Sequence, residues 1–130
     1  MKLLYLSLLL FSPFVLQNTG DPIEKTAALL RNANISELSQ YFALNIDLTI
    51  GGEENNYSNT QAKTILTNFF NENQPKTVKV LHRITSSDKF HYGVIIMTTA
   101  NSTYRIAFSL KNNQGKFELT EMRIEPEKTK

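Results

Sequence analysis

The sequence contains no cysteine in its 130 residues. A bacterial lipoprotein carries its lipid on a cysteine, so the absence excludes that route to a membrane, and it excludes disulfide bonds as well. The protein must therefore fold by side-chain packing alone. The roughly 110 residues that follow the N-terminal segment are enough for one domain with its own core.

A surplus of charge is also lacking. The chain has 14 basic and 12 acidic side chains, and Lys2 is the only charged residue among the first twenty. Without Lys2, 13 basic residues stand against 12 acidic ones, and the basic residues are dispersed singly along the chain. This pattern argues against a nucleic-acid-binding surface and against a polybasic patch for a membrane.

Only one long apolar run occurs, over residues 3–16, and it directly follows Lys2. Ser12 and Pro13 interrupt it, and it is shorter than the ~20 residues of a membrane-spanning helix. One positive charge before a short apolar stretch is typical of a secretory signal peptide, although a membrane anchor or a buried strand are alternatives. We assign residues 1–20 to a signal peptide, with cleavage between 17 and 21, and expect a periplasmic or extracellular protein.

Residues 21–130 read as one domain that begins with helices. Asp21 followed by Pro22 is an N-cap and a first helical turn, and the apolar spacing carries this helix to residues 31–34. Ser36 is expected to cap a short turn over residues 37–41. Ser58 and Gln61 form a capping box for a second helix, which Pro75 ends after residues 72–73.

The other segments read as strands. Residues 42–50 alternate between apolar and polar side chains, with positions 42, 44, 46, 48 and 50 on the core face. After Gly51 and Gly52, residues 53–57 are a polar loop or a short edge strand. Four further strands are expected over 76–85, 90–100, 103–111 and 116–125, with a bulge near Thr120 and Glu121. This order predicts an α+β domain in which helices cover one face of a curved antiparallel sheet.

This order of elements resembles the nuclear transport factor 2-like (cystatin-like) cone fold over residues 21–126. In several short sequence segments, the protein also resembles a family of small secreted proteins of Bacteroidetes-type bacteria called domain of unknown function 4783. The segments that carry this resemblance are residues 38–42, 45–50, 57–58, 61–62, 69–70, 75–76, 80–82 and 103–105. The resemblance implies an exported cone-fold protein. It implies no activity and no functional residues, because none is assigned to the family.

Asp47 is the first candidate for a site residue, because cone folds usually enclose a pocket between the sheet and the helices. If the polar side of its strand lined that pocket, burial would raise the pKa of Asp47 and suit it to act as a general base. If the apolar side of the strand faces the core instead, Asp47 points to solvent or to a lysine on a neighbouring strand. We favour the second interpretation.

His82 and His91 are the only histidines, and they lie on consecutive strands. A turn centred between residues 86 and 87 would make them direct cross-strand neighbours. Two histidines can hold a metal weakly, but no third ligand is evident, so we favour a surface pair and expect no metal. A shift of one residue in register would abolish the pairing.

Tyr104 shares its strand face with Ile106 and Phe108, so its ring either packs in the core or lines a pocket, where Tyr92 could meet it. Arg105 points to the opposite face. With arginines 83 and 123 it could form a basic stripe that holds an anion. Cross-strand ion pairs with glutamates 118 and 121 are the favoured alternative. The pocket-lining candidates are thus Asp47, His82, His91, Tyr92, Tyr104 and Arg105.

No catalytic motif is present. Gly51 and Gly52 precede two glutamates, which would repel phosphate, and no serine has the context of a nucleophile elbow. We therefore expect an exported, non-enzymatic domain that binds a small molecule or a protein, without catalytic residues or cofactor. The alternative is a small lyase or isomerase that uses an acid–base residue in the pocket. A homodimer is a further expectation.

Overall fold

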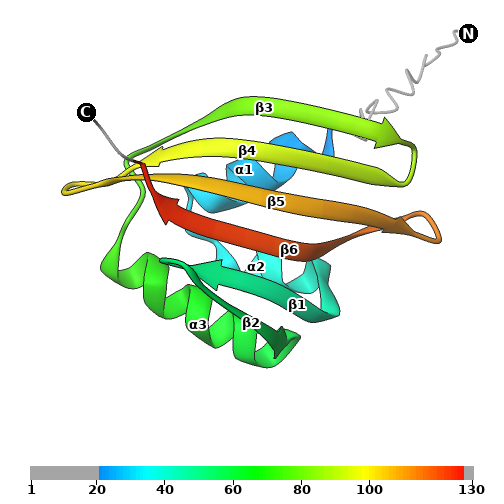
Figure 1. Ribbon diagram of the computed structural model, residues 1–130, viewed down its shortest axis with the longest axis horizontal. Helices are drawn as coiled ribbons and strands as arrows, with labels where there is room; N and C mark the ends of the chain where they lie inside the picture. Colours follow the sequence, from blue (N-terminus) through cyan, green and yellow to red (C-terminus); the bar gives the residue numbers. More distant parts are fainter. Residues whose placement is uncertain (1–20, 128–130) are drawn as a thin grey trace, which may run out of the picture.

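A computed structural model describes residues 21–127 (Figure 1). The expected signal peptide therefore lies outside the described residues. Helices come first, and the order of elements confirms the predicted α+β class. The elements are α1 Pro22–Arg31, α2 Ile35–Leu38, the 3-10 helix η1 Ser39–Tyr41, β1 Phe42–Ile50, β2 Glu53–Ser58, α3 Asn59–Glu72, β3 Thr77–Ser87, β4 Phe90–Thr98, β5 Thr103–Asn113 and β6 Lys116–Pro126.

The six strands form one sheet in the order β2-β1-β6-β5-β4-β3. Residues 53–58 thus form an edge strand, one of the two alternatives that their polar sequence allowed. All neighbours are antiparallel except β1 and β6, which run parallel. Helix α1 packs on β3 and β4, and α3 packs on β1 and β2, so that the helices lie on one side of the sheet (Figure 1).

The helix starts follow from local capping. The Asp21 side chain accepts a hydrogen bond of 2.9 Å from the backbone N–H of Ile23. Ser58 and Gln61 form the predicted capping box of α3. The short helix α2 differs from the prediction. Its N-cap is Asn34, which accepts a hydrogen bond from the backbone N–H of Glu37, so Ser36 is not the cap.

Irregularities in the strand pairing determine which side chains face the helices. Between β5 and β6 the register shifts so that Thr120 has no partner, which confirms the bulge predicted there. The register between β1 and β6 also shifts, between Phe42 and Asp47. Leu44 lies inside this irregular stretch and is 81% exposed. The expectation that Leu44 belongs to the core face is therefore wrong, because strict alternation does not survive the irregularity.

The core lies between the helices and the facing side of the sheet, and Gly93 permits a close approach of the two layers. A Cβ atom at Gly93 would lie 2.8 Å from Phe108 Cζ and 2.9 Å from Ile23 Cγ2. Helix α1 carries Ile23, and β5 carries Phe108, so the absent side chain lets α1 rest directly on the sheet. This contact fixes where the start of α1 lies.

Candidate functional site

A cleft of about 680 Å³ separates α1 from the turn end of the β5–β6 hairpin. This size falls within the range of pockets that bind small molecules. Buried Leu29 and Leu110 and half-buried Phe117 form its apolar floor. Tyr41 from η1 closes one side, and the other side is open to solvent. The cleft is thus a shaped, partly apolar hollow at one end of the sheet.

The helical repeat of α1 explains its contribution. Lys25, Ala28 and Leu29 are three and four residues apart, so they share one face of the helix. On the sheet side, the β5–β6 turn places Lys116 and Phe117 opposite that face. Gly115 lines the cleft at this turn with a positive φ of 83°, a conformation that glycine adopts without strain.

Two lysines flank the apolar floor. The Lys25 ammonium lies 4.9 Å from the centre of the Tyr41 ring, a cation–π arrangement. The polar interaction with the Tyr41 side chain raises the pKa of Lys25, and the charge of Glu37 adds to this effect. Lys25 is therefore a cation throughout the neutral pH range. Lys116 is exposed on the opposite rim.

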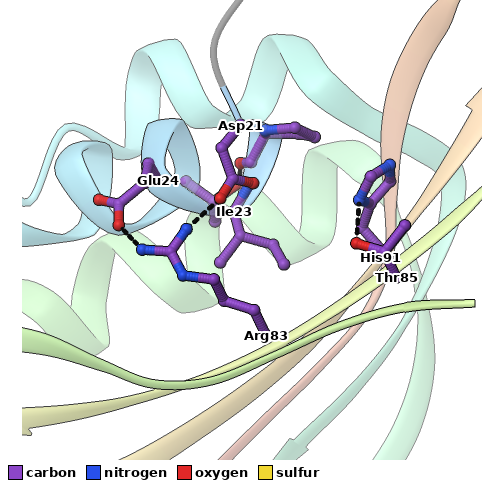
Figure 2. A network of polar contacts seen from close by, with 8 residues as sticks. Asp21, Ile23, Glu24, Arg83, Thr85 and His91 are labelled. Atoms are coloured by element: carbon purple, nitrogen blue, oxygen red, sulfur yellow. Dashed lines mark hydrogen bonds and ion pairs between the residues drawn. The ribbon is translucent and has the colours of Figure 1, made fainter.

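A network of ion pairs holds the start of α1 against β3 (Figure 2). Arg83 on β3 donates one hydrogen bond to Asp21 and a second to Glu24. Both carboxylates raise the pKa of Arg83, and Glu24 has the larger effect. Arg83 therefore stays charged at any physiological pH. Asp21 and Glu24 both line the cleft. The two acidic side chains of the cleft are thus already bound to an arginine.

The two histidines do not pair. His82 lies opposite Val94, and His91 lies opposite Thr85, because the turn of this hairpin is at Asp88 and Lys89 and because Ser86 has no partner in β4. His82 and His91 consequently occupy opposite faces of the sheet. The predicted cross-strand pair is therefore wrong.

His91 faces the helices near the cleft. Its Nδ1 lies 3.2 Å from the Thr85 hydroxyl oxygen (Figure 2). Its ring also packs edge-on against Phe117, with 4.9 Å between ring centres. His91 thus supports the cleft floor from beside it. Within residues 21–127, no group of three histidine, aspartate or glutamate side chains is placed to hold a metal ion.

Tyr92 and Tyr104 also lie on opposite faces. Tyr92 is paired with Ser109, and Tyr104 is paired with Met97, so the alternative in which the two rings meet in a pocket is wrong. The Tyr104 hydroxyl donates a hydrogen bond of 3.0 Å to Asn73, and its ring packs edge-on against Phe69 of α3. Tyr104 therefore joins α3 to the sheet.

Asp47 and Arg105 lie on the sheet face away from the helices. Asp47 is exposed and accepts a hydrogen bond of 2.8 Å from Asn56 on β2. Arg105 forms an ion pair of 3.6 Å with Glu127. Because Arg83 faces the helices and Arg105 faces away from them, the three-arginine stripe does not form. These surface ion pairs contribute little to stability.

None of the six candidate residues lines the cleft. Sequence reasoning missed Lys25, Tyr41, Lys116 and Phe117, which come from segments far apart in the chain. The one local signal was the helical spacing of Lys25, Ala28 and Leu29, which marks a face but not what lies opposite.

Of the helices within residues 21–127, none is long and apolar enough to span a membrane.

A curved six-stranded sheet with helices on one face and a cleft at one end defines the nuclear transport factor 2-like fold class. A solved designed protein of the Rd1NTF2_05 series has this fold. It superposes with a TM-score of 0.62 and 11% identity, over 79% of this chain and 92% of that chain. The fold that the sequence resembles is therefore the fold of the protein.

The model of the family described as "Domain of unknown function (DUF4783)" matches residues 23–125, and the chain belongs to this family. A family protein from Bacteroides uniformis ATCC 8492 superposes with a TM-score of 0.78 and 21% identity, over 84% of this chain and 100% of that chain. A family protein from Bacteroides fragilis YCH46 superposes with a TM-score of 0.73 and 24% identity, over 78% of this chain and 94% of that chain. The resemblance to this family that the short sequence segments indicated is thereby confirmed. No curated protein matches the chain by sequence.

Proposed function

We propose that this protein is an exported domain that binds a small, partly apolar ligand in the cleft between α1 and the β5–β6 hairpin, without chemical conversion. The cleft itself carries the proposal, because it combines a volume of about 680 Å³ with a floor of leucine and phenylalanine side chains. A few polar groups at the rim of an apolar hollow are the usual composition of a ligand site.

The chemistry of the rim favours binding over catalysis. A lyase or isomerase needs an acid or base that is free to exchange a proton with the ligand. Asp21 and Glu24, the carboxylates of the cleft, are exposed to solvent in part and are bound to Arg83. An ion-paired carboxylate serves to position a helix better than it serves as a general base.

Filling the cleft tests the proposal. Ala28 is partly exposed on the α1 face that lines the cleft, so Ala28→Phe places a ring there without disturbing the core. We expect a panel of apolar and amphipathic small molecules to include compounds that raise the melting temperature of the natural protein. The same compounds should bind Ala28→Phe at least about tenfold more weakly and should therefore raise its melting temperature less.

Ala100→Phe is the matched control, because Ala100 is exposed in the turn between β4 and β5, outside the cleft. It should respond to the panel as the natural protein does. Equal loss of response in the two variants, or full response in Ala28→Phe, would place binding elsewhere and reject the cleft.

Export is part of the proposal and has its own test. The apolar run after Lys2 predicts that the N-terminal segment is removed during secretion. N-terminal sequencing of the exported protein should therefore begin between residues 18 and 21. Protein that starts at Met1 and stays in the membrane fraction would contradict the signal peptide. The homodimer stays a prediction, for which light scattering is the direct measurement.

A further inference from the structure

We propose that the ligand of the cleft is an anionic amphiphile, a molecule with one apolar chain or ring and a single carboxylate-type head group. This inference rests on the proposed function and adds the chemical class of the ligand. It follows from how the charges of the rim are satisfied and where they lie relative to the apolar floor.

The acidic side of the rim is partly neutralised. Arg83 donates one hydrogen bond to Asp21 and another to Glu24, so that one positive charge stands against two negative charges (Figure 2). With Lys25 and Lys116, which line the cleft, three positive charges stand against these two negative charges. The net charge around the cleft thus disfavours a positively charged ligand and favours an anion.

The basic side of the rim is free to take an anion. Within the described residues, neither Lys25 nor Lys116 forms an ion pair with a carboxylate. Lys25 is held over the Tyr41 ring, which orients its ammonium without neutralising it. Lys116 lies across the cleft on the hairpin turn. Two ammonium groups on opposite rims can share one carboxylate, whose two oxygens accept several hydrogen bonds.

The floor determines the remainder of the ligand. Leu29, Leu110 and Phe117 offer only carbon atoms, so the part of a ligand that contacts them gains by leaving water. The free energy of that transfer is lost for a polar group without a hydrogen-bond partner. A compact anion such as phosphate would contact the lysines but leave the floor uncovered. The combination therefore selects a molecule with a charged end and an apolar body.

Decanoate is a suitable probe, with decanol and decyltrimethylammonium as its neutral and cationic counterparts. We expect the exported protein, studied by calorimetry below the micelle concentration or solubility limit of each probe, to bind decanoate about tenfold more tightly than decanol, the effect of one charge-assisted contact. Decyltrimethylammonium should bind more weakly than decanol. Decanoate binding should weaken about threefold on raising salt from low to physiological concentration, because the lysines are exposed.

Substitution of the lysines separates the head group from the tail. Lys25→Gln and Lys116→Gln should each reduce the preference for decanoate over decanol by about threefold, while decanol affinity stays the same. Lys79→Gln is the matched control, because Lys79 is exposed on β3 and lies on the sheet face away from the cleft. It should leave the preference unchanged. Thermal unfolding of each variant checks that the fold is intact.

The outcomes distinguish the inference from the function on which it rests. Equal affinity for decanoate and decanol, unaffected by either lysine substitution, would overturn the anionic class but leave an apolar binding cleft. Absence of binding by all three decyl probes would overturn the proposed function as well.

One other occupant of the cleft is tested in the same series. Binding only to vesicles of anionic phospholipid, without binding of monomeric decanoate, would identify a lipid surface and reject the free ligand.

Discussion

Replacing Gly93 with alanine is expected to lower the free energy of unfolding by about 2 kcal/mol, a cost typical of overpacked cores. The added methyl group would lie under 3 Å from carbon atoms of Phe108 and Ile23. Both side chains are almost fully buried, so neither can move aside without displacing its element. Thermal unfolding followed by circular dichroism should show a melting temperature lower by roughly 10 °C.

A second substitution tests that explanation. Phe108→Leu removes the ring atoms Cζ and Cε1, which the alanine methyl group would otherwise strike. The double variant should therefore be more stable than the sum of the two single changes predicts, by about 1 kcal/mol. Simple additivity would mean that the cost of Gly93→Ala does not come from this contact. Gly93→Ala by itself should also bind cleft ligands more weakly, because α1 forms one wall of the cleft.

Phe70→Ala is expected to have the largest effect on stability, a loss of about 4 kcal/mol. Phe70 is 1% exposed and is the last large apolar side chain of α3, the helix that covers β1 and β2. Removing its ring leaves a cavity that the surrounding core fills only in part. Since small domains are stable by only about 5–15 kcal/mol, urea denaturation should show a markedly lower midpoint.

Phe90→Ala provides the matched comparison, because it makes the same chemical change at a residue that is 46% exposed. It should cost less than about 1 kcal/mol. Similar losses for the two phenylalanines would contradict the assignment of Phe70 to the core of the helix–sheet interface.

Local signals predicted most of the elements correctly. The N-cap at Asp21 and the capping box of Ser58 and Gln61 were identified from spacing alone, since the residues that form them are two or three positions apart. The bulge at Thr120 was predicted because the apolar residues of β6 change from odd to even positions there. Each of these features depends on near neighbours in the chain.

The wrong predictions share a different cause. The His82–His91 pair assumed a turn centred between residues 86 and 87, but the turn lies at Asp88 and Lys89 and Ser86 is unpaired, which changes the register of β3 against β4. Leu44 was assigned to the core on strict alternation, which the irregular stretch between β1 and β6 breaks. A one-residue shift moves a side chain to the other face of a sheet, so small errors in register change which residues can share a site.

The sequence by itself determined the order of helices and strands, the caps of α1 and α3, and the family, because these depend on short-range hydrogen bonds, periodicity and recurring sequence segments. Only the tertiary structure decided that β1 lies parallel to β6, and that Lys25, Tyr41 and Lys116 surround one cleft. Those residues come from a helix, a 3-10 turn and a hairpin that are remote in the chain. Their meeting depends on how closely α1 packs against the sheet at Gly93, and no local pattern encodes that distance.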